Sequence, residues 1–269
     1  MQKRVLSVQD LSCFGKCSNA VALPIISAAG HECVFLPTAL LSTHTGGFEG
    51  YSFLDLTEEM KKIIAHWREM GLRFDALYTG YFASAEQLDL VRSFLQETQL
   101  LRVIDPVMGD RGCLYSIYDE QFVRHMRAFC SGADVITPNV TEASLLAETD
   151  FCGDQYEETA MRKMVEALFA LGVRRVVLTG VRFGDSEIGV VAADSVTGTW
   201  DCFRTPYADT YFHGGGDTFA STLCAKLVSG IPFREAAREA LDFTFRSIMR
   251  TVPTEVRYGL CFEPELKTL

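Results

Sequence analysis

Short apolar runs that alternate with helix-like segments constrain the fold of this chain more than any other feature. Most runs are followed by a segment in which apolar side chains recur at helical spacing, as in 84–97, 119–131 and 157–171. The runs themselves occupy residues 5–8, 33–37, 76–78, 102–106, 134–138 and 174–180. This alternation predicts an α/β fold, with a largely parallel central sheet and helices on both of its faces.

The stretch VVAADSVTGTWDCF (residues 190–203) departs from that alternation. Thr197 and Gly198 supply turn chemistry between two β-rich runs, which predicts an antiparallel hairpin added at one edge of the sheet. The chain has 269 residues, 48% of them hydrophobic, which is enough to bury one large core. Because no linker, low-complexity tract or fixed-period repeat interrupts it, we expect a single domain over residues 1–269.

The distribution of charge argues against two kinds of binding partner. The net charge is −10, from 35 acidic and 25 basic residues without a dense basic run, so neither nucleic acid nor a membrane surface is expected as a partner. Gln9 and Asp10 break the first apolar run, which argues against a signal peptide, and no run approaches the roughly 20 apolar residues of a membrane span. The nine cysteines form no CxxC pair, so free thiols in a cytoplasmic protein are favoured over disulfides or a zinc site.

Polar side chains follow the predicted strands. In open parallel sheets ligands bind at the carboxyl ends of the strands, so these positions are where a site is expected. They are Gln9 and Asp10, then Thr79, Gly80 and Tyr81, then Asp105 and Asp110, then Thr137 and Asn139, and finally Thr179. Each one alone fits an ordinary loop residue, but their joint placement on one edge of the sheet predicts a binding site.

The segment HGGGDTFAS (residues 213–221) places Gly214, Gly215 and Gly216 directly before a predicted helix. The helix is indicated by one apolar face, Phe219, Leu223 and Leu227 with Ala220, Cys224 and Val228, and by Gly230 and Pro232 after its end. Unpaired N–H groups and the positive end of the helix dipole attract anions to such an N-terminus. A phosphate or a developing oxyanion therefore fits this segment.

Asp217 has two readings at the first turn of that helix. It can be an acid that compensates the helix dipole, or a general base that takes the proton from a hydroxyl as its oxygen attacks phosphorus. In the second reading the glycine N–H groups stabilise charge on the transferred phosphoryl group. The motif by itself leaves both readings open.

Further acids occur in VIDPVMGDRG and TPNVTEA. Asp105 and Asp110 supply the few carboxylates that Mg²⁺ combines with water and substrate phosphates. Asn139 and Glu142 fit an N-cap with a capping-box acid, or else Glu142 orders Mg²⁺-bound water. The P-loop and dinucleotide-binding motifs are both absent from the sequence. A kinase with this sequence must therefore neutralise the phosphates with a helix N-terminus and a metal, helped by the positive charge of Lys16 or Arg111.

The three motifs GGGD, DPVMGD and TPNxxE, in this relation to strands and helices, resemble the ribokinase superfamily of small-molecule kinases. VLSVQ, FGKCSNAVALP, STHTG at 42–46 and YTGY at 78–81 are similar to its vitamin B6 kinase branch. The resemblance runs from about Val5 to the helix after Asp217. It implies a ribokinase-like, Rossmann-like three-layer fold, a homodimer, and transfer of phosphate from ATP to the 5'-hydroxymethyl group of pyridoxal, pyridoxine or pyridoxamine, with Mg²⁺ and, as an open point, a monovalent cation.

The resemblance also implies roles for individual residues. Asp217 matches the catalytic base, and Gly214, Gly215 and Gly216 match the anion hole. Asp105, Asp110 and Glu142 match acids near metal and phosphates, and Thr137, Asn139 and Thr179, with Asp105 and Glu142, match the nucleotide site. Thr45 and Tyr81, with His44 beside them, match positions around the pyridine ring, and Asp10 stands where many members have a serine that faces the ring.

Three departures from the family pattern accompany these matches. Gly215 stands where threonine is common, Asp10 where serine is common, and the segment after Asp110 is shorter than the lid of some relatives. A carboxylate at position 10 favours a protonated ring or a substrate ammonium group, which is a hypothesis about vitamer preference. The alternatives are a hydroxymethylpyrimidine kinase of the same superfamily and a noncatalytic vitamer or nucleotide sensor.

Overall fold

The computed structural model describes residues 2–95, 99–208, 210, 212–251 and 253–269, with only the backbone described at 253–255. The chain divides into two compact units, and each is described by itself. Unit 1 combines Met1–Leu101 with Ala208–Leu269, and unit 2 is Arg102–Tyr207. The prediction of a single domain over the whole chain stays a prediction.

The sheet strands of unit 1 follow the order β4-β1-β2-β3. They are β1 (Arg4–Ser12), β2 (Glu32–Leu41), β3 (Phe53–Asp55) and β4 (Ala76–Thr79). β1 pairs in parallel with both β2 and β4, and β3 is an antiparallel edge strand. Three of the predicted apolar runs are therefore confirmed as strands, and β3, which the sequence did not predict, is added to them.

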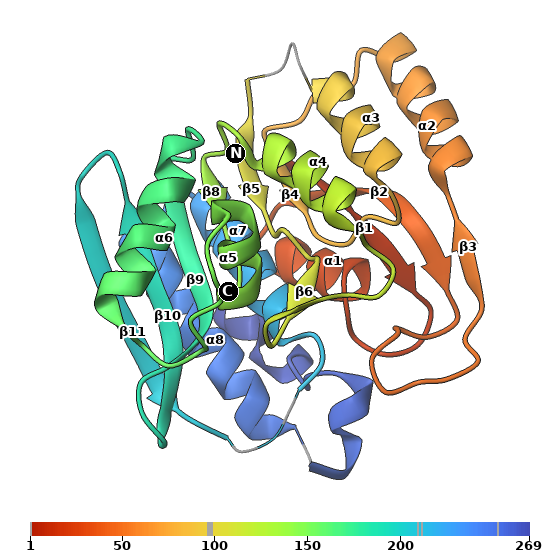
Figure 1. Cartoon of the computed structure of the whole chain (residues 1–269). Coiled ribbons are helices and arrows are strands. Elements are labelled where there is room, and N and C mark those ends of the chain that lie inside the picture. The colour runs from red at the N-terminus through yellow and green to blue at the C-terminus, as the bar shows by residue number, and fades with distance from the viewer. Residues whose placement is uncertain (1, 96–98, 209, 211, 252) are drawn as a thin grey trace. The chain divides into compact units, whose positions relative to one another are not determined.

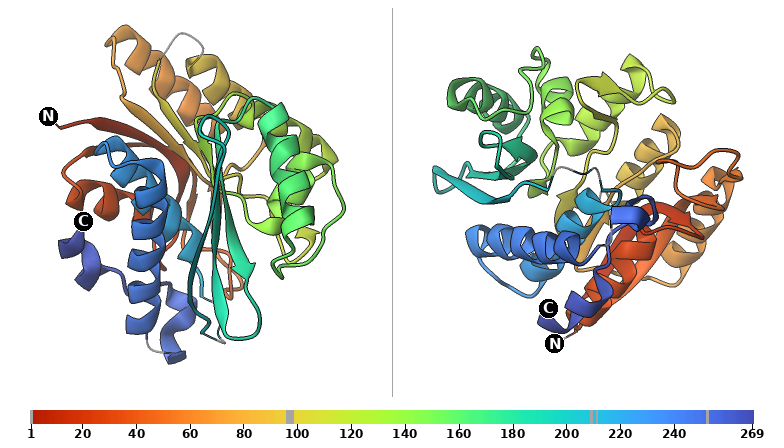
Figure 2. Two further views of the ribbon diagram at one scale, coloured as in Figure 1. Left: turned by 90° about the vertical axis from the view of Figure 1, so that its left-hand side faces the viewer. Right: turned by 90° about the horizontal axis from the view of Figure 1, so that it is seen from below.

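Helices cover both faces of the sheet in unit 1. Figure 2 shows α2 (Thr57–Glu69) and α3 (Ala85–Leu95) on one face, and α1 (Asn19–Ala28) with α7 (Gly215–Val228) on the other. α8 (Phe233–Arg250) packs on α7, and the short 3₁₀ helices η1 (Pro253–Tyr258) and η2 (Glu263–Thr268) follow it. This arrangement brings the glycine motif at the start of α7 to the carboxyl end of β1.

The sheet strands of unit 2 follow the order β11-β10-β9-β8-β5. They are β5 (Leu101–Ile104), which begins at the unit boundary, β8 (Val135–Ile136), β9 (Arg175–Arg182), β10 (Glu187–Asp194) and β11 (Thr199–Pro206). β5, β8 and β9 are parallel, whereas β10 and β11 form the antiparallel hairpin that was predicted at one edge. A separate two-stranded ribbon joins β6 (Gly109–Asp110) to β7 (Cys113–Leu114).

Three helices form a row over the sheet of unit 2 (Figure 1). They are α4 (Glu120–Cys130), α5 (Val140–Ala147) and α6 (Glu158–Ala170). α5 lies between the other two and packs on β9. This packing places the N-terminus of α5 at the carboxyl ends of the strands. The helical segments predicted at 84–97, 119–131 and 157–171 are confirmed as α3, α4 and α6, except that residues 96–98 lie outside the described part of the chain.

The predicted helix after the glycine motif is confirmed as α7, and it is buried on more sides than its apolar face alone requires. Every residue from Thr218 to Ala225 is buried. The polar residues are accommodated because Thr218 Oγ1 donates to Gly214 O (2.7 Å) and Thr222 Oγ1 to Thr218 O (2.8 Å). Hydroxyl groups that bond to the preceding helical turn can be buried on any side of a helix.

Two other predictions can be compared directly with the structure. All nine cysteines are free thiols, as expected. Within the described residues no helix combines the length and the apolar character that crossing a membrane requires.

Candidate active site

The N-terminus of α7 has a shape that only glycine permits. Gly214, its N-cap, has φ +74°, and a Cβ atom at this position would lie 2.1 Å from the main-chain oxygen of Lys16. A Cβ atom on Gly215 or Gly216 would meet no atom within 4 Å. Gly214 is therefore the glycine that allows the start of α7 to approach the main chain at Lys16. Among the described residues no side chain caps the helix at Gly214, so the main-chain N–H groups that follow it are open to a ligand.

Asp217 lies in the first turn of this helix and is half-buried. Burial raises the pKa of its carboxyl group to about 6, the hydrogen bond from the main-chain N–H of Ser18 opposes the rise, and the charge of Asp10 adds to it. The thiol of Cys17 also donates to Asp217, and burial raises the pKa of that thiol well above its usual value, so the thiol keeps its proton. Asp217 is therefore a positioned carboxylate whose pKa suits proton transfer near neutral pH.

Asp10 lies at the end of β1 and is only 6% exposed. Its Oδ2 accepts a hydrogen bond from Ser12 Oγ (3.0 Å) and its Oδ1 accepts one from Ser18 Oγ. Burial raises the pKa of Asp10, and these two hydroxyl donors oppose the rise. The charge of Asp10 also raises the pKa of Asp217 and of Tyr81, so two of the other predicted residues lie near this buried carboxylate.

His44 and the loop around it close against the glycine motif. His44 Nδ1 accepts from Gly46 N–H (3.2 Å), so Nε2 carries the proton and donates it to Arg257 O (2.7 Å). The rings of His44 and His213 have centroids 5.0 Å apart. Burial lowers the pKa of both rings, which favours the neutral imidazoles.

Two glycines make room for this pair of rings. A Cβ atom on Gly15 would lie 2.3 Å from the ring of His44, and one on Gly46 would lie 2.3 Å from the ring of His213. Thr45, the residue between His44 and Gly46, is exposed. The STHTG and HGGGD motifs are therefore brought together, and unit 1 assembles the predicted residues Asp10, His44, Thr45, Tyr81 and Asp217.

The predicted nucleotide residues lie on neighbouring strands of unit 2. Asp105 directly follows β5, Thr137 directly follows β8, and Thr179 lies in β9. Thr137 N–H donates to Ile104 O (3.0 Å) and Thr179 N–H donates to Pro138 O (2.9 Å), so the three strand ends are adjacent. Thr137 Oγ1 is buried and has no hydrogen-bond partner among the described residues, so it can donate to a ligand.

Asn139 and Glu142 form a complete capping box at the start of α5. Glu142 N–H donates to Asn139 Oδ1 (2.9 Å), and Glu142 Oε2 accepts from Asn139 N–H (2.9 Å). Glu142 Oε1 also accepts from Met108 N–H (3.1 Å), and Asn139 Nδ2 donates to Gly109 O (2.8 Å). The structural reading of these two residues is confirmed, and the hydrogen bonds also tie α5 to the segment that carries Asp110.

Burial raises the pKa of Glu142 to about 8. The main-chain hydrogen bonds that Glu142 accepts oppose this rise, and the nearby charge of Asp110 adds to it. Across the described part of the chain, no group of three or more His, Cys, Asp or Glu side chains could hold a metal ion, so Asp105, Asp110 and Glu142 do not form a three-ligand cluster. Mg²⁺ needs only one or two carboxylates because water and substrate phosphates complete its coordination. A buried carboxyl beside a second acid fits this donor set, and the metal assignment stays a prediction.

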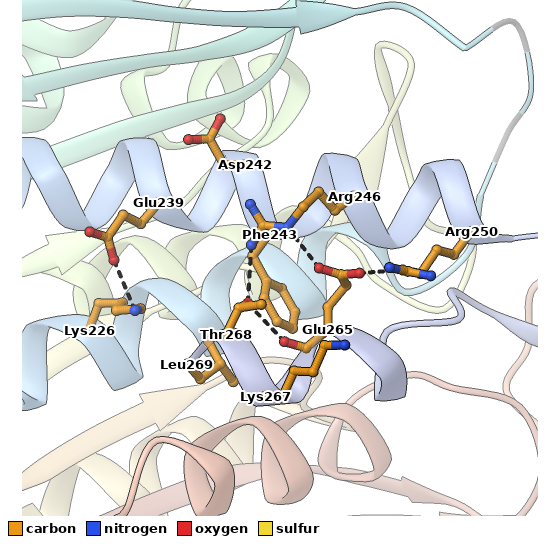
Figure 3. Close-up of a pocket in the computed structure, with 10 residues that line it drawn as sticks. All are labelled: Lys226, Glu239, Asp242, Phe243, Arg246, Arg250, Glu265, Lys267, Thr268 and Leu269. Carbon is orange, nitrogen blue, oxygen red and sulfur yellow. Dashed lines mark hydrogen bonds and ion pairs between the residues drawn. The ribbon is translucent and has the colours of Figure 1, made fainter.

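A cavity of about 680 Å³ lies elsewhere in unit 1, between α8 and the C-terminal segment (Figure 3). Five of its charged side chains pair with one another: Glu265 accepts from Arg246 Nε (2.8 Å) and from Arg250, and Lys226 lies 2.9 Å from Glu239. None of the predicted site residues lines this cavity. The buried Glu265 anchors η2 on α8, so the cavity is a structural contact and not the candidate site.

Comparison with known proteins gives the family. The phosphomethylpyrimidine kinase model matches residues 23–260. This chain belongs to that family. It is 33% identical to a pyridoxine kinase of Bacillus subtilis over 195 residues, which span 70% of this chain and 69% of the relative.

Two solved structures of related proteins agree with the fold. A crystal structure described as a putative phosphomethylpyrimidine kinase of Bacteroides thetaiotaomicron, with pyridoxal, is 34% identical and has a TM-score of 0.93, with 100% of this chain and 96% of that chain covered. Pyridoxal kinase of Lactobacillus plantarum is 30% identical, with a TM-score of 0.92 and the same coverage. The predicted resemblance to B6 kinases of the ribokinase superfamily is confirmed, and so is the α/β fold with a mostly parallel sheet flanked by helices.

Lys16 and Arg111, the two basic residues proposed to help neutralise the phosphates, each have an acidic partner nearby. Lys16 Nζ lies 2.8 Å from Glu263 Oε2, and Arg111 Nε lies 3.9 Å from Asp110 Oδ2. The sequence also gave no role to Cys17 or Ser18, which both donate to Asp217. The signal that could have directed attention to them is the KCSN segment (residues 16–19), which ends on the first residue of α1 and forms part of the family resemblance.

Proposed function

We propose that this protein is an ATP-dependent kinase that phosphorylates the 5'-hydroxymethyl group of a vitamin B6 vitamer to give the 5'-phosphate. The observation that carries the proposal is the setting of Asp217: a half-buried carboxylate with a pKa raised to about 6, at a helix N-terminus with open N–H groups. The B. thetaiotaomicron relative was crystallised with pyridoxal, and the relatives named above include pyridoxine and pyridoxal kinases.

In the proposed reaction Asp217 removes the proton from the 5'-hydroxyl group as that oxygen forms a bond to the γ-phosphorus of ATP. The bond from phosphorus to the ADP oxygen breaks, and Asp217 retains the proton until it is released to water. The N–H groups that follow Gly214 stabilise the charge on the transferred group. The open space beside Gly215 and Gly216 is consistent with a phosphoryl group there.

The remaining predicted residues have binding roles in this proposal. Tyr81, His44 and Thr45 hold the pyridine ring, because an aromatic side chain beside a flat substrate buries area and fixes its plane. Thr137, Asn139 and Thr179, with Asp105 and Glu142, line the nucleotide. Bound Mg²⁺ supplies positive charge to the phosphate oxygens, and we propose Asp105, Asp110 and Glu142 as the residues that hold it directly or through water.

The proposal extends to the assembly and to its compartment. The resemblance to B6 kinases implies a homodimer. Nine free thiols suit the reducing cytoplasm, which we propose as the location.

A second candidate function is phosphorylation of hydroxymethylpyrimidine. It is favoured by the family model, which describes a phosphomethylpyrimidine kinase and spans most of the chain. Both substrates are flat heteroaromatic rings with a CH₂OH group, so the catalytic residues do not separate them.

The experiment measures ATP consumption with pyridoxal, pyridoxine, pyridoxamine and hydroxymethylpyrimidine. We expect turnover of at least one B6 vitamer, and we expect Asp217→Asn to reduce kcat by about 10²- to 10⁴-fold, or roughly 3 to 5 kcal/mol of transition-state stabilisation. ATP binding by the variant, measured by calorimetry, is retained because the nucleotide residues are unchanged.

Asp242→Asn is the matched control. Asp242 is an exposed acid on α8 beside the cavity of Figure 3, so losing its charge leaves turnover near that of the wild type. A wild-type protein that turns over none of the three vitamers contradicts the proposed function.

A further inference from the structure

Ser18 occupies a backbone conformation that is unusual for a serine. It has φ +52° and ψ −127°, and it is one of three non-glycine residues with positive φ among those described. Side chains rarely adopt this region, which glycine enters readily. A strained residue of this kind persists where surrounding contacts determine its conformation.

The side chain of Ser18 also does not cap the helix that it precedes. Ser18 is the N-cap residue of α1, where a serine side chain normally accepts a hydrogen bond from the first turn, yet in the described structure its hydroxyl makes no such cap. The hydroxyl instead donates to Asp10 Oδ1. The helix therefore starts without the usual cap while the serine serves a different contact.

The main-chain N–H of the same residue donates to the carboxylate of Asp217. Ser18 thus touches two carboxylates through two different groups: Asp10 through Oγ and Asp217 through N–H. Asp10, at 6% exposure, is shielded from water and accepts hydrogen bonds from two hydroxyl groups, so its charge acts on its surroundings with little screening.

We propose that Ser18 couples Asp10 to Asp217, which makes Asp10 a positioning residue for the general base. This inference rests on the proposed function. Asp10 fixes the hydroxyl of Ser18, the fixed residue presents its N–H to Asp217, and the charge of Asp10 strengthens Asp217 as a base. Each oxygen of Asp10 accepts one hydrogen bond, from Ser12 or from Ser18, so the position of the carboxylate is fixed from both sides.

Besides each other, the two carboxylates face Cys17, His44 and Tyr81. Burial raises the pKa of Tyr81, so its hydroxyl group keeps its proton. Asp10 on β1 and Cys17 before α1 face Asp217, and the thiol of Cys17 keeps its proton.

His44 faces Asp10, and its ring lies at a tilt of 38° against the ring of His213 from the segment before α7. Burial favours the neutral forms of both imidazoles. The fall of kcat/KM at acidic pH is therefore set by protonation of the two carboxylates.

Two variants separate the charge from the hydrogen bond. Asp10→Asn keeps an oxygen that can accept from Ser18 Oγ but removes the charge, so the pKa of Asp217 falls and the acidic limb of kcat/KM moves to lower pH. Ser18→Gly keeps the charge and permits the same φ, but it removes the hydroxyl that holds the N–H in place. The pKa of Asp217 then rises and the acidic limb moves to higher pH. Both variants should retain more activity than Asp217→Asn.

Ser12→Ala is the matched control, because it removes a hydroxyl bonded to Asp10 that does not lead to Asp217. We expect its acidic limb to coincide with that of the wild type. Thermal unfolding of each variant establishes that it is folded, and Ser18→Gly provides the test if Asp10→Asn does not fold.

Opposite shifts in the two variants support the coupling. Limbs that coincide with the wild type, limbs that move in the same direction, or a Ser12→Ala shift equal to that of Ser18→Gly would overturn it. If Asp10→Asn changes the ratios of kcat/KM among the three vitamers without moving the limb, Asp10 contacts the substrate and the coupling is wrong. A wild type without vitamer kinase activity, in contrast, defeats the proposed function itself.

Discussion

The starts of α5 and α7 carry similar sequence signals but differ in what their N–H groups contact. At α5, Asn139 and Glu142 close the helix end with a reciprocal capping box, and Glu142 accepts a further bond from Met108 N–H. At α7, the N-cap is Gly214, and no described side chain caps the helix. The first helix end is satisfied by the protein, whereas the second is available to an anion.

The acids on these two helices differ for the same reason. The oxygens of Glu142 are used by main-chain N–H groups within its own helix end and the neighbouring segment, which orders that part of unit 2. Asp217 is held by Cys17 and Ser18 from a separate segment, so its position is fixed without closing the helix end. A capped acid stabilises structure, and an acid held from outside an uncapped helix can act on a ligand.

The largest effect beyond loss of the base itself is expected at Gly214. Gly214→Ala forces a side chain into positive φ and places its Cβ atom against Lys16 O, so we expect a loss of roughly 2 to 6 kcal/mol in the free energy of unfolding. Gly216→Ala, whose Cβ atom meets nothing within 4 Å, is the control and should be neutral or slightly more stable. Urea unfolding of the two variants measures the contrast, and equal losses would mean that the start of α7 does not depend on Gly214.

The next effect concerns pH and the closed helix end. Burial raises the folded-state pKa of Glu142 to about 8, above its unfolded value, so the native protein holds a proton that the unfolded chain has lost. The contribution of Glu142 to stability is therefore greatest below its unfolded pKa and declines as the pH rises toward 8. The slope approaches about 1.4 kcal/mol per pH unit.

This pH effect is measured as the difference in unfolding free energy between the wild type and Glu142→Gln, in the presence of a chelator, from pH 5 to pH 7. The difference should shrink with rising pH, because glutamine does not titrate. A difference that stays constant over this range would show that Glu142 is already ionised in the folded protein.

A smaller effect is expected from removal of the α5 cap. Asn139→Ala loses the N-cap bond and the bond to Gly109 O, and should cost about 0.5 to 2 kcal/mol in unfolding free energy. Asp119→Ala is the comparison, since Asp119 caps α4 through Phe122 N–H (2.9 Å) without a predicted ligand role. If Asn139 lines the nucleotide, only Asn139→Ala also raises KM for ATP, and equal KM values for the two variants would restrict Asn139 to capping.

The smallest effect is expected at Gly215. Gly215→Thr introduces the residue that is common at this position in the family, and the open space around Gly215 accommodates it. We expect a gain of up to about 1 kcal/mol in unfolding free energy, from reduced freedom of the unfolded chain, and a kcat close to that of the wild type. A marked loss of kcat would indicate that the phosphoryl group needs the space beside Gly215.

The parts of this structure that depend on local patterns could be predicted from the sequence. The capping box of Asn139 and Glu142 spans only four residues, and the end of α7 is marked by Gly230, which has φ +86° at that point. Strand β3 was missed because its three exposed residues are too few to form a pattern. The burial of α7 on all sides was missed because Thr218 and Thr222 appear polar until their hydroxyl groups are seen to bond within the helix.

The candidate site was only partly predictable for a similar reason. Each acid could be placed at a strand or helix end, because that position follows from the adjacent element. The contacts of Asp217 with Cys17 and Ser18 join segments that are far apart in the chain, and the positive φ of Ser18 has no local sequence signal. Position in an element was therefore predictable, and the partner that fixes each side chain was not.

The division of the chain into units also has a consequence for synthesis. Unit 2 is one continuous stretch, whereas unit 1 is built from both ends of the chain and includes contacts such as Lys16 N–H to Tyr258 O (2.9 Å). A ribosome that has reached Tyr207 has made every residue of unit 2 but has not yet made Asp217. Asp217 follows unit 2 in the chain, so the proposed base is always synthesised after the proposed nucleotide residues. A chain that terminates at the end of unit 2 therefore carries the proposed nucleotide residues without the proposed catalytic base.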